Sequence, residues 1–293
     1  MSSVEEHLAV RRSAGLFDFS FMALHEFSAR SDLQPLQTRN LDELLAGQIV
    51  YTLLLKPDGA VLIDATAWRL DAERFWLFAG KRLPYGGRDR SGEFAILALQ
   101  GPASGMILSR LIGKEAVLAL RYFHFVERSG LLVGRIGYSG ELGYELLVPA
   151  AGGAALRQEL LQAGRNEGLR ECGWAAADSL RIEAGYVLFD REVDGKANPA
   201  ELGLERLAPG KAFAVKRRLA GLEVLDDAGR RDLPHAQITS ECFSPTLGRS
   251  LALGFVAPQA ATGSVVRTNG RVARVASLPF YDPQRRRPRG AAL

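Results

Sequence analysis

The chain has 293 residues, of which 47% are hydrophobic and 24% charged, and its formal net charge is +4. This length and composition are typical of a globular protein with two domains and exclude a fibrous or disordered chain. No apolar run approaches the roughly 18 residues of a membrane span, and the acidic N-terminus does not resemble a signal peptide, so we expect a cytoplasmic protein without membrane contact.

Strands and helices alternate in the first part of the chain. Apolar residues at every second position, or short apolar runs, indicate strands, and apolar residues three or four positions apart indicate helices. In chain order we expect a helix at 5–14, a strand at 16–22, a helical turn at 42–47, strands at 49–55, 60–69, 75–79 and 94–100, a helix at 105–112 capped by Ser104, strands at 122–126 and 131–136, and helices at 154–168 and 175–184.

One apolar strand, at 60–69, contains an aspartate, Asp64. Aspartate is among the poorest strand residues, and a buried one must be paired, hydrogen-bonded or used in chemistry. An aspartate on the solvent-facing side of the strand is the alternative, and the pattern alone leaves both open.

A glycine-rich hairpin is expected at 135–149, with three glycines between Gly137 and Gly143. Glycine permits positive φ and a close approach of the backbone to another group. Glu141 and Glu145 are anomalous in so apolar a segment, because a carboxylate there is either solvated or accepts hydrogen bonds from a donor. Residue types alone leave a surface hairpin and a ligand-binding hairpin both open.

Only short strands are predicted beyond Pro209 and Gly210. Regularly spaced short strands between Gly and Asp turns are typical of a small β-barrel or sandwich. We therefore predict an α+β protein with a first domain at 1–208 and a β domain at 209–293, and no dinucleotide or Walker-type phosphate motif is present. The predicted strands of the second domain are 222–225, 251–256, 264–267 and 271–276.

The cysteines and histidines do not predict a metal site. Cys172 and Cys242 are isolated, and the four histidines are scattered. Arginines cluster near the C-terminus. Without them the 37 basic residues of the chain become as numerous as its 33 acidic residues. No aromatic residues are interleaved with this cluster, so we expect a solvated tail and no nucleic-acid partner. The cluster consists of Arg285, Arg286, Arg287 and Arg289.

Seven blocks, spread over nearly the whole chain, carry a resemblance to a known family. They are EHLAVRRSAGLFD (6–18), YTLLLKPDGAVLID (51–64), LALQGP (97–102), the hairpin at 135–149, DSLRIEAG (178–185), SPTLGRSLALG (244–254) and LPFYDP (278–283). In this order they resemble the aminomethyltransferase (glycine-cleavage T-protein) family, whose fold also forms the folate domains of sarcosine and dimethylglycine oxidases.

The resemblance implies a fold and an activity. The fold is a folate-binding one, with ferredoxin-like α/β subdomains followed by a C-terminal β-barrel around a central cavity. The activity is transfer of a one-carbon unit from a small amine or lipoyl-bound donor to tetrahydrofolate. These compounds are the partners that the resemblance implies.

The resemblance also implies roles for single residues. Asp64 matches the catalytic aspartate, and Tyr51, Tyr138 and Glu145 match positions that line the pterin site. Arg181 is the second arginine of the family's Arg-Asp-x-Leu-Arg block, with folate binding and a structural ion pair to Glu183 or Asp178 as the alternatives. A carboxylate such as Glu145 can accept two adjacent N–H groups of a pterin edge, and an anionic Asp64 can stabilise a cationic one-carbon centre or move a proton. Glu141 is assigned a turn or surface role.

Three residues depart from the family pattern. Ala177 replaces an arginine, Gly80 an asparagine and Phe21 a histidine. The segment before the first helix and the passages 81–92 and 226–237 are also expected to be shorter than in the family. These differences favour a changed donor, weaker folate binding or a pocket completed by a partner subunit.

The departures keep a second function open, a non-catalytic folate-binding accessory subunit of an amine-oxidising or one-carbon complex. An iron–sulfur version is disfavoured because the lysine-glycine-cysteine-tyrosine signature of that branch does not occur in the chain.

Overall fold

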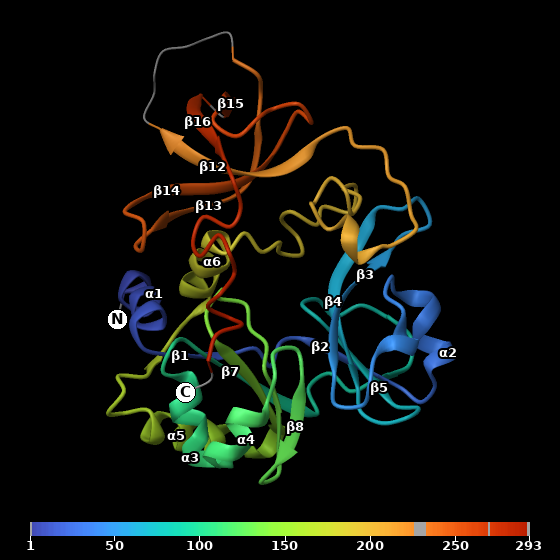
Figure 1. The fold of residues 1–293 in the computed structure, drawn as a ribbon, viewed down its shortest axis with the longest axis vertical. Coiled ribbons are helices and arrows are strands. Elements are labelled where there is room, and N and C mark those ends of the chain that lie inside the picture. The colour runs from blue at the N-terminus through green and yellow to red at the C-terminus, as the bar shows by residue number, and fades with distance from the viewer. Residues whose placement is uncertain (1, 226–232, 269, 292–293) are drawn as a thin grey trace.

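The computed structural model describes residues 2–225, 233–268 and 270–291, which form three sheets and the helices around them (Figure 1). The helix α1 begins with a capping box, because the Ser2 side chain and the Glu5 side chain bond reciprocally to backbone N–H groups. The α-helices are α1 (Ser3–Arg12), α2 (Arg30–Leu33), α3 (Ser104–Ile112), α4 (Lys114–Ala119), α5 (Gly153–Ala163) and α6 (Trp174–Glu183).

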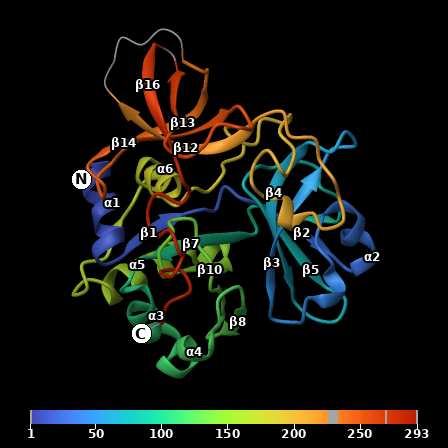
Figure 2. The ribbon, with the colours of Figure 1, turned by 45° about the horizontal axis from the view of Figure 1, so that its top comes forward.

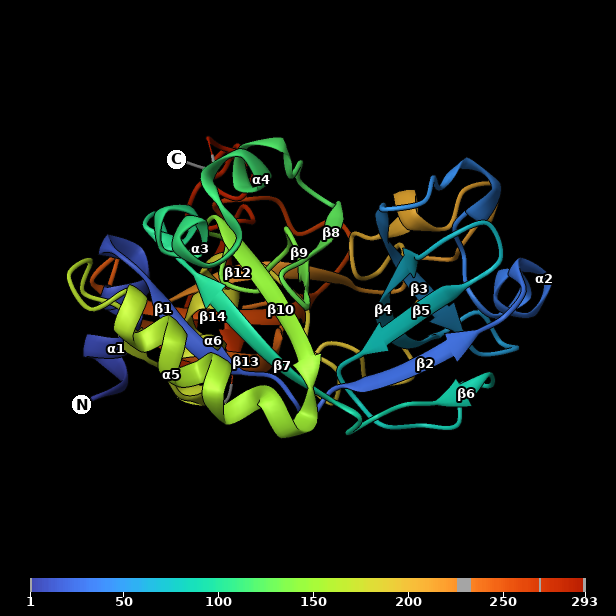
Figure 3. The ribbon, with the colours of Figure 1, turned by 90° about the horizontal axis from the view of Figure 1, so that it is seen from below.

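The first sheet has six strands, and α3 and α5 pack on one of its faces (Figure 3). Side chains alternate along its central strand β10, so Tyr144 and Leu146 enter the helix-covered core while Glu145 points to the opposite face. The strand order is β11 (Arg170–Glu171), β1 (Gly15–Asp18), β7 (Phe94–Gln100), β10 (Gly143–Pro149), β9 (Leu131–Gly134) and β8 (Phe125–Arg128).

The second sheet has five antiparallel strands and lies beside the first (Figure 3). Its own core contains Phe27, Leu33, Ile63, Phe75 and Leu77. The strand order is β3 (Ile49–Leu55), β4 (Val61–Arg69), β5 (Phe75–Ala79), β2 (Ala23–Phe27) and β6 (Arg88–Asp89).

The third sheet forms the barrel-like C-terminal part, and α6 packs against its strands β13 and β14 (Figures 1 and 2). Because α6 also contacts α1, α6 connects the first part of the chain to the third sheet. The strand order is β13 (Gln237–Ser244), β14 (Arg249–Val256), β12 (Arg218–Leu225), β16 (Arg271–Ala276) and β15 (Val265–Thr268).

Most predicted elements are confirmed, and the α+β class with them, whereas some details were wrong. The strand expected at 16–22 ends at Asp18, and Ser104 begins α3 without capping it. The elements that were missed include α2, α4, β2, β6, β11 and β13, which are short or contain polar residues that obscure the period of their apolar ones. The passage 226–237 lies largely outside the described residues.

The C-terminal tail is not merely solvated, so that expectation was wrong. After β16 the chain passes α6 and ends beside α3 (Figure 1). Arg135 donates a hydrogen bond to the carbonyl of Gly290, and Arg287 lies 3.5 Å from the Glu141 carboxylate and over the ring of Tyr281. The tail is thereby fixed to the glycine-rich hairpin of the first sheet.

Within the described parts of the chain, no helix is both long enough and apolar enough to cross a membrane.

Candidate functional site

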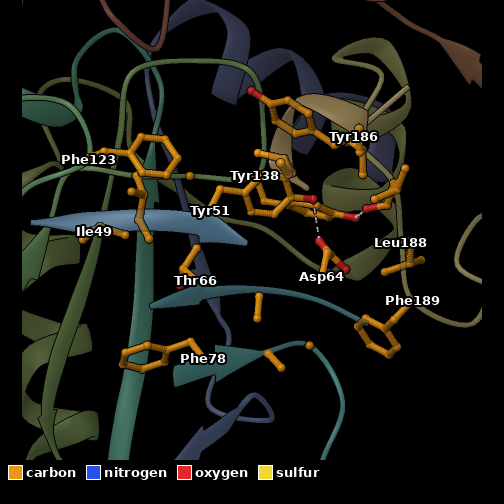
Figure 4. A pocket seen from close by; sticks show the side chains of 18 of the residues that line it. Ile49, Tyr51, Asp64, Thr66, Phe78, Phe123, Tyr138, Tyr186, Leu188 and Phe189 are labelled. Atoms are coloured by element: carbon orange, nitrogen blue, oxygen red, sulfur yellow. Dashed lines mark hydrogen bonds between the residues drawn. The ribbon is translucent and has the colours of Figure 1, made fainter. Parts of the chain in front are cut away.

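A cavity of about 660 Å³ lies where the first two sheets meet the tail. Its volume is within the range of about 300–1,000 Å³ that small-molecule sites occupy. Its wall is mainly aromatic and aliphatic (Figure 4). The charged residues that line it are Arg39, Asp64, Glu145, Arg206, Arg285 and Arg289.

Strands β3, β4 and β5 provide one wall of the cavity. Tyr51 is opposite Thr66 in the register, and Thr66 is opposite Phe78, so these three side chains form a row on one face. Asp64 lies on the same face as Thr66, two residues earlier on β4. The alternate residues Ile63 and Ala65 belong to the core on the other face. The pattern that makes Asp64 anomalous in the sequence thus directs it into the cavity.

The Tyr51 hydroxyl donates a hydrogen bond of 2.9 Å to Oδ2 of Asp64 (Figure 4). Burial raises the pKa of the Asp64 carboxyl, while the hydrogen bond from Tyr51 acts in the opposite direction. Burial raises the pKa of Tyr51 well above its usual value, with the charge of Asp64 adding to the effect. The tyrosine therefore stays a hydroxyl donor and keeps Oδ2 occupied.

Glu145 enters the cavity from β10 of the first sheet. Its cross-strand neighbours are Gly134 on β9 and Ala98 on β7, and the ring of Trp68 fills the space beside Gly134. Glu145 is only 7% exposed, and no described residue forms a hydrogen bond or ion pair with its carboxylate. Burial alone raises its pKa to about 7. A buried carboxylate without a partner is available to accept hydrogen bonds from a ligand.

Tyr138 and Tyr186 form an aromatic wall. Their rings stack with centroids 5.9 Å apart and planes inclined by 28°. The Tyr138 hydroxyl donates to the carbonyl of Val187 at 2.6 Å, so it is already satisfied within the protein. The Tyr138 side chain can therefore provide a flat surface, and its hydroxyl is not free to act as a ligand donor.

Arg181 does not line the cavity. It is fully buried, and its guanidinium contacts Asp178 and Glu192, at 2.8 and 2.7 Å, as well as Ser240. With its nitrogens used in this way Arg181 has a structural role, and the expected assignment to folate binding is corrected. The ion pair with Asp178 was one of the alternatives, while the pair with Glu183 does not form.

Glu141 is not a surface residue, which corrects a second expectation. It is 2% exposed, and Arg11 lies 3.1 Å from its carboxylate. Arg11 also contacts Glu183 at 2.7 Å, and His7 lies 3.1 Å from the same Glu183. These groups connect α1, α6 and the hairpin, which keeps the hairpin in place behind the cavity.

Comparisons with known proteins match nearly the whole chain. Residues 1–83 and 86–211 match the GCVT N-terminal domain, and residues 217–282 match the glycine cleavage T-protein C-terminal barrel domain. The chain belongs to the glycine cleavage T-protein family. The family that the seven blocks indicate is thus confirmed.

Relatives within the T-protein family align along most of their length. Proteins named aminomethyltransferase from Symbiobacterium thermophilum and Thermosynechococcus vestitus are each 34% identical, covering 98% and 99% of this chain and 91% and 90% of theirs. The crystal structure of glycine cleavage system aminomethyltransferase T from Bartonella henselae superimposes with a TM-score of 0.82 at 26% identity, covering 96% of this chain and 90% of that one.

The departures from the T-protein pattern can be placed in the structure. A side chain on Gly80 would begin 2.2 Å from the ring of Phe189, so this ring occupies the space beside the backbone of Gly80. Phe21 is 43% exposed at the cavity, with its ring edge-on to Trp174 at 5.8 Å. Ala177 lies on α6, buried in the core, and does not line the cavity.

Several cavity residues were missed in the sequence. Tyr186 and Phe189 follow directly after the DSLRIEAG block, so their position next to it was an available signal. Tyr122, between α4 and β8, gave no comparable signal. The tail arginines Arg285 and Arg289 gave none either, because only the return of the tail to the first sheet brings them to the cavity.

Proposed function

We propose that Asp64 and Glu145 are the working carboxylates of a tetrahydrofolate-dependent one-carbon transferase. That the chain is an enzyme of the aminomethyltransferase class, whose members transfer one-carbon units to tetrahydrofolate, follows from its family and its near full-length relatives. What this chain adds is a cavity to which each of the first two sheets contributes one carboxylate. Tetrahydrofolate, when bound, supplies the nucleophilic nitrogen that accepts the one-carbon unit.

The carboxylate of Glu145 is the observation that carries this proposal. It is buried, without a partner among the described residues, and lines the same cavity as an aromatic wall suited to a flat ring. Adjacent ring N–H groups fit such a carboxylate, because both can donate to it and the pairing is charge-assisted. We therefore propose that Glu145 binds and orients the pterin, with Tyr51 and Tyr138 as parts of the wall.

Asp64 has a different role in this proposal. Tyr51 occupies Oδ2, which leaves Oδ1 without a side-chain donor in the described chain. An aspartate fixed in this way can stabilise positive charge on the transferred carbon or take up a proton. We assign the chemical step to Asp64 and binding to Glu145.

The one-carbon donor is a small amine or a lipoyl-bound aminomethyl group. The aromatic pair of Phe21 and Trp174 at the cavity suits an apolar donor arm. A cytoplasmic location and a partner that delivers the donor stay predictions.

Binding of 5-methyltetrahydrofolate, a stable analogue, tests this function. We expect a rise of the thermal midpoint, since a ligand that binds only the native state stabilises it by mass action, together with a saturable heat of binding in calorimetry. Absence of both signals would contradict the proposal. Binding without single-turnover transfer from any amine or lipoyl donor would instead support the accessory function.

A further inference from the structure

An aromatic ring stands where a side chain beside Asp64 would otherwise lie. Strands β4 and β5 are antiparallel, with Ala65 opposite Ala79. One residue further along this register Asp64 comes opposite Gly80, and directly opposite residues face the same side of a sheet with Cβ positions roughly 4.5–5.5 Å apart. Gly80 has no side chain, and a Cβ placed on it would lie 2.2 Å from the ring of Phe189. The Phe189 ring therefore fills the position next to the Asp64 side chain.

The segment that carries this ring is anchored on both sides. The backbone N–H of Leu188 donates to the Glu192 carboxylate at 2.9 Å, and the ammonium of Lys81 donates to the Asp190 carboxylate at 2.7 Å. The Phe189 ring itself packs against the core of the second sheet and lines the cavity. It is thus a fixed part of the cavity wall.

Asp64 has a different neighbour on each side. The Tyr51 hydroxyl, from β3, donates to Oδ2 of Asp64. The Phe189 ring, on the side of β5, offers no polar atom, and in the view of Figure 4 Asp64 lies between Tyr51 and Phe189. A ligand group that approaches Oδ1 of Asp64 therefore meets an apolar surface and has only the space that this ring leaves.

We propose that Phe189 limits the size of the substituents on the donor nitrogen, so that the enzyme selects donors whose nitrogen is unsubstituted. This inference rests on the proposed function, in which the transferred carbon lies at Asp64. The donor nitrogen is bonded to that carbon, so the groups that it carries also lie next to Asp64. Because packed protein interiors accommodate extra bulk poorly, the ring disfavours the larger groups. Phe189 determines specificity and takes no part in the chemical step.

The reaction run in reverse tests this limit with amines of different size. The protein receives 5,10-methylenetetrahydrofolate, dihydrolipoamide and either ammonia or propylamine, and the tetrahydrofolate that forms is measured. The methylene carbon exchanges its bonds to two folate nitrogens for one bond to sulfur and one to the amine nitrogen, while one thiol proton and one amine proton pass to the folate nitrogens. We expect kcat/KM of the wild type to be at least about tenfold higher with ammonia, since even one methylene group changes specificity roughly 10- to 200-fold.

Variants of the ring should change this preference. Phe189→Ala should lose most of it, because a hole replaces the ring beside Asp64. Phe189→Leu retains more of the packing, so it should fold even if the alanine variant does not, and should show an intermediate preference. Adding Gly80→Ala to Phe189→Ala returns a methyl group to the vacated space and should restore part of the preference. Phe243→Ala is the control and should keep the wild-type preference, because Phe243 is 58% exposed on β13 and does not line the cavity.

Thermal denaturation with propylammonium chloride gives a readout that does not depend on turnover. The hole in Phe189→Ala should take up the propyl group with the ammonium at Asp64, so the thermal midpoint should rise more in this variant than in the wild type. Equal use of both amines by the wild type, or an unchanged preference in Phe189→Ala, would overturn the inference and leave the proposed function intact. If neither amine reacts, equal thermal shifts in the two proteins would overturn it. Failure of the wild type to bind 5-methyltetrahydrofolate would instead contradict the proposed function.

Discussion

Tyr51 donates a 2.9 Å hydrogen bond to Asp64 across the neighbouring strands β3 and β4. The two residues are not directly opposite, since Tyr51 is paired with Thr66 and Asp64 with Leu53. The diagonal contact is within reach because both side chains lie on the same face. Its consequence is an aspartate with one oxygen held and one oxygen free for chemistry.

Asp64→Asn should retain folate binding and lose turnover. The amide keeps the shape of the side chain and removes the negative charge, so transfer should fall by at least about 100-fold, as for loss of other positioned acid–base or electrostatic groups. Single-turnover kinetics and calorimetry on the same preparation separate the two effects. An equal loss of affinity in this variant would contradict the separate roles of Asp64 and Glu145.

Tyr51→Phe should slow the reaction less than Asp64→Asn and change its pH dependence. The hydrogen bond from Tyr51 opposes the effect of burial on the Asp64 pKa. Without the hydroxyl the pKa of Asp64 should rise further, so the acidic limb of the rate profile should move to higher pH. The measurement is the pH profile of kcat, and an unchanged profile would argue against ionised Asp64 as the active form.

Glu145→Gln should weaken folate binding and remove its pH dependence near neutrality. In the free protein the pKa of Glu145 is about 7 because of burial. Since a carboxylate accepts pterin N–H groups and a neutral acid accepts them less well, wild-type affinity should fall as the pH is lowered through 7. Calorimetry at a series of pH values from about 5.5 to about 8.5 measures the folate affinity. The affinity of the variant should not change over this range. A sloping profile in the variant would assign the titration to another group.

The same carboxylate should make the unliganded protein less stable as the pH rises. The pKa of Glu145 is raised from 4.5 to about 7 on folding, so between these values the folded state binds more protons than the unfolded state. The free energy of unfolding should therefore decrease over this range, by about 3 kcal/mol in total at 1.36 kcal/mol per pKa unit. Asp64, whose pKa is also raised, acts with the same sign. Urea titrations at several pH values give the free energy of unfolding, which should change with pH by different amounts in the wild type and in Glu145→Gln. The same pH dependence in both proteins would disprove the assignment.

Gly80→Ala should destabilise the protein by about 1–3 kcal/mol, because its methyl group would enter the ring of Phe189. Phe189→Ala removes that ring, so adding it to Gly80→Ala should restore part of the loss. A double-mutant cycle by chemical denaturation measures the coupling. Additive effects would show that the ring moves aside at no cost.

Arg181→Met should destabilise the fold and leave folate affinity unchanged. The substitution leaves Glu192 buried without its guanidinium partner at 2.7 Å, and loss of one partner of a buried pair costs about 3–5 kcal/mol. Adding Glu192→Gln should recover part of the stability. A loss of folate affinity in a stably folded Arg181→Met protein would show that Arg181 contributes to folate binding.

The sequence by itself determined the α+β class, the family and most of the strands. Alternation of side chains is a local property, so β3, β5 and β7 were predicted with the bounds that the structure gives them. Asp64 and Glu145 also stood out locally, because each is a charged residue in an apolar strand. That both side chains lie at one cavity agrees with the expectation from the resemblance.

Tertiary structure alone decided the roles of Arg181, Glu141 and the arginine tail. Charge and residue type do not tell whether an arginine meets solvent, a ligand or a buried acid, since the partner comes from a distant part of the chain. Arg181 pairs with Glu192 and donates to Ser240, and Arg11 pairs with Glu141. The return of the tail to the first sheet brings Arg285 and Arg289 to the cavity. Long-range packing determines which charges are neutralised and which stay free to bind a ligand.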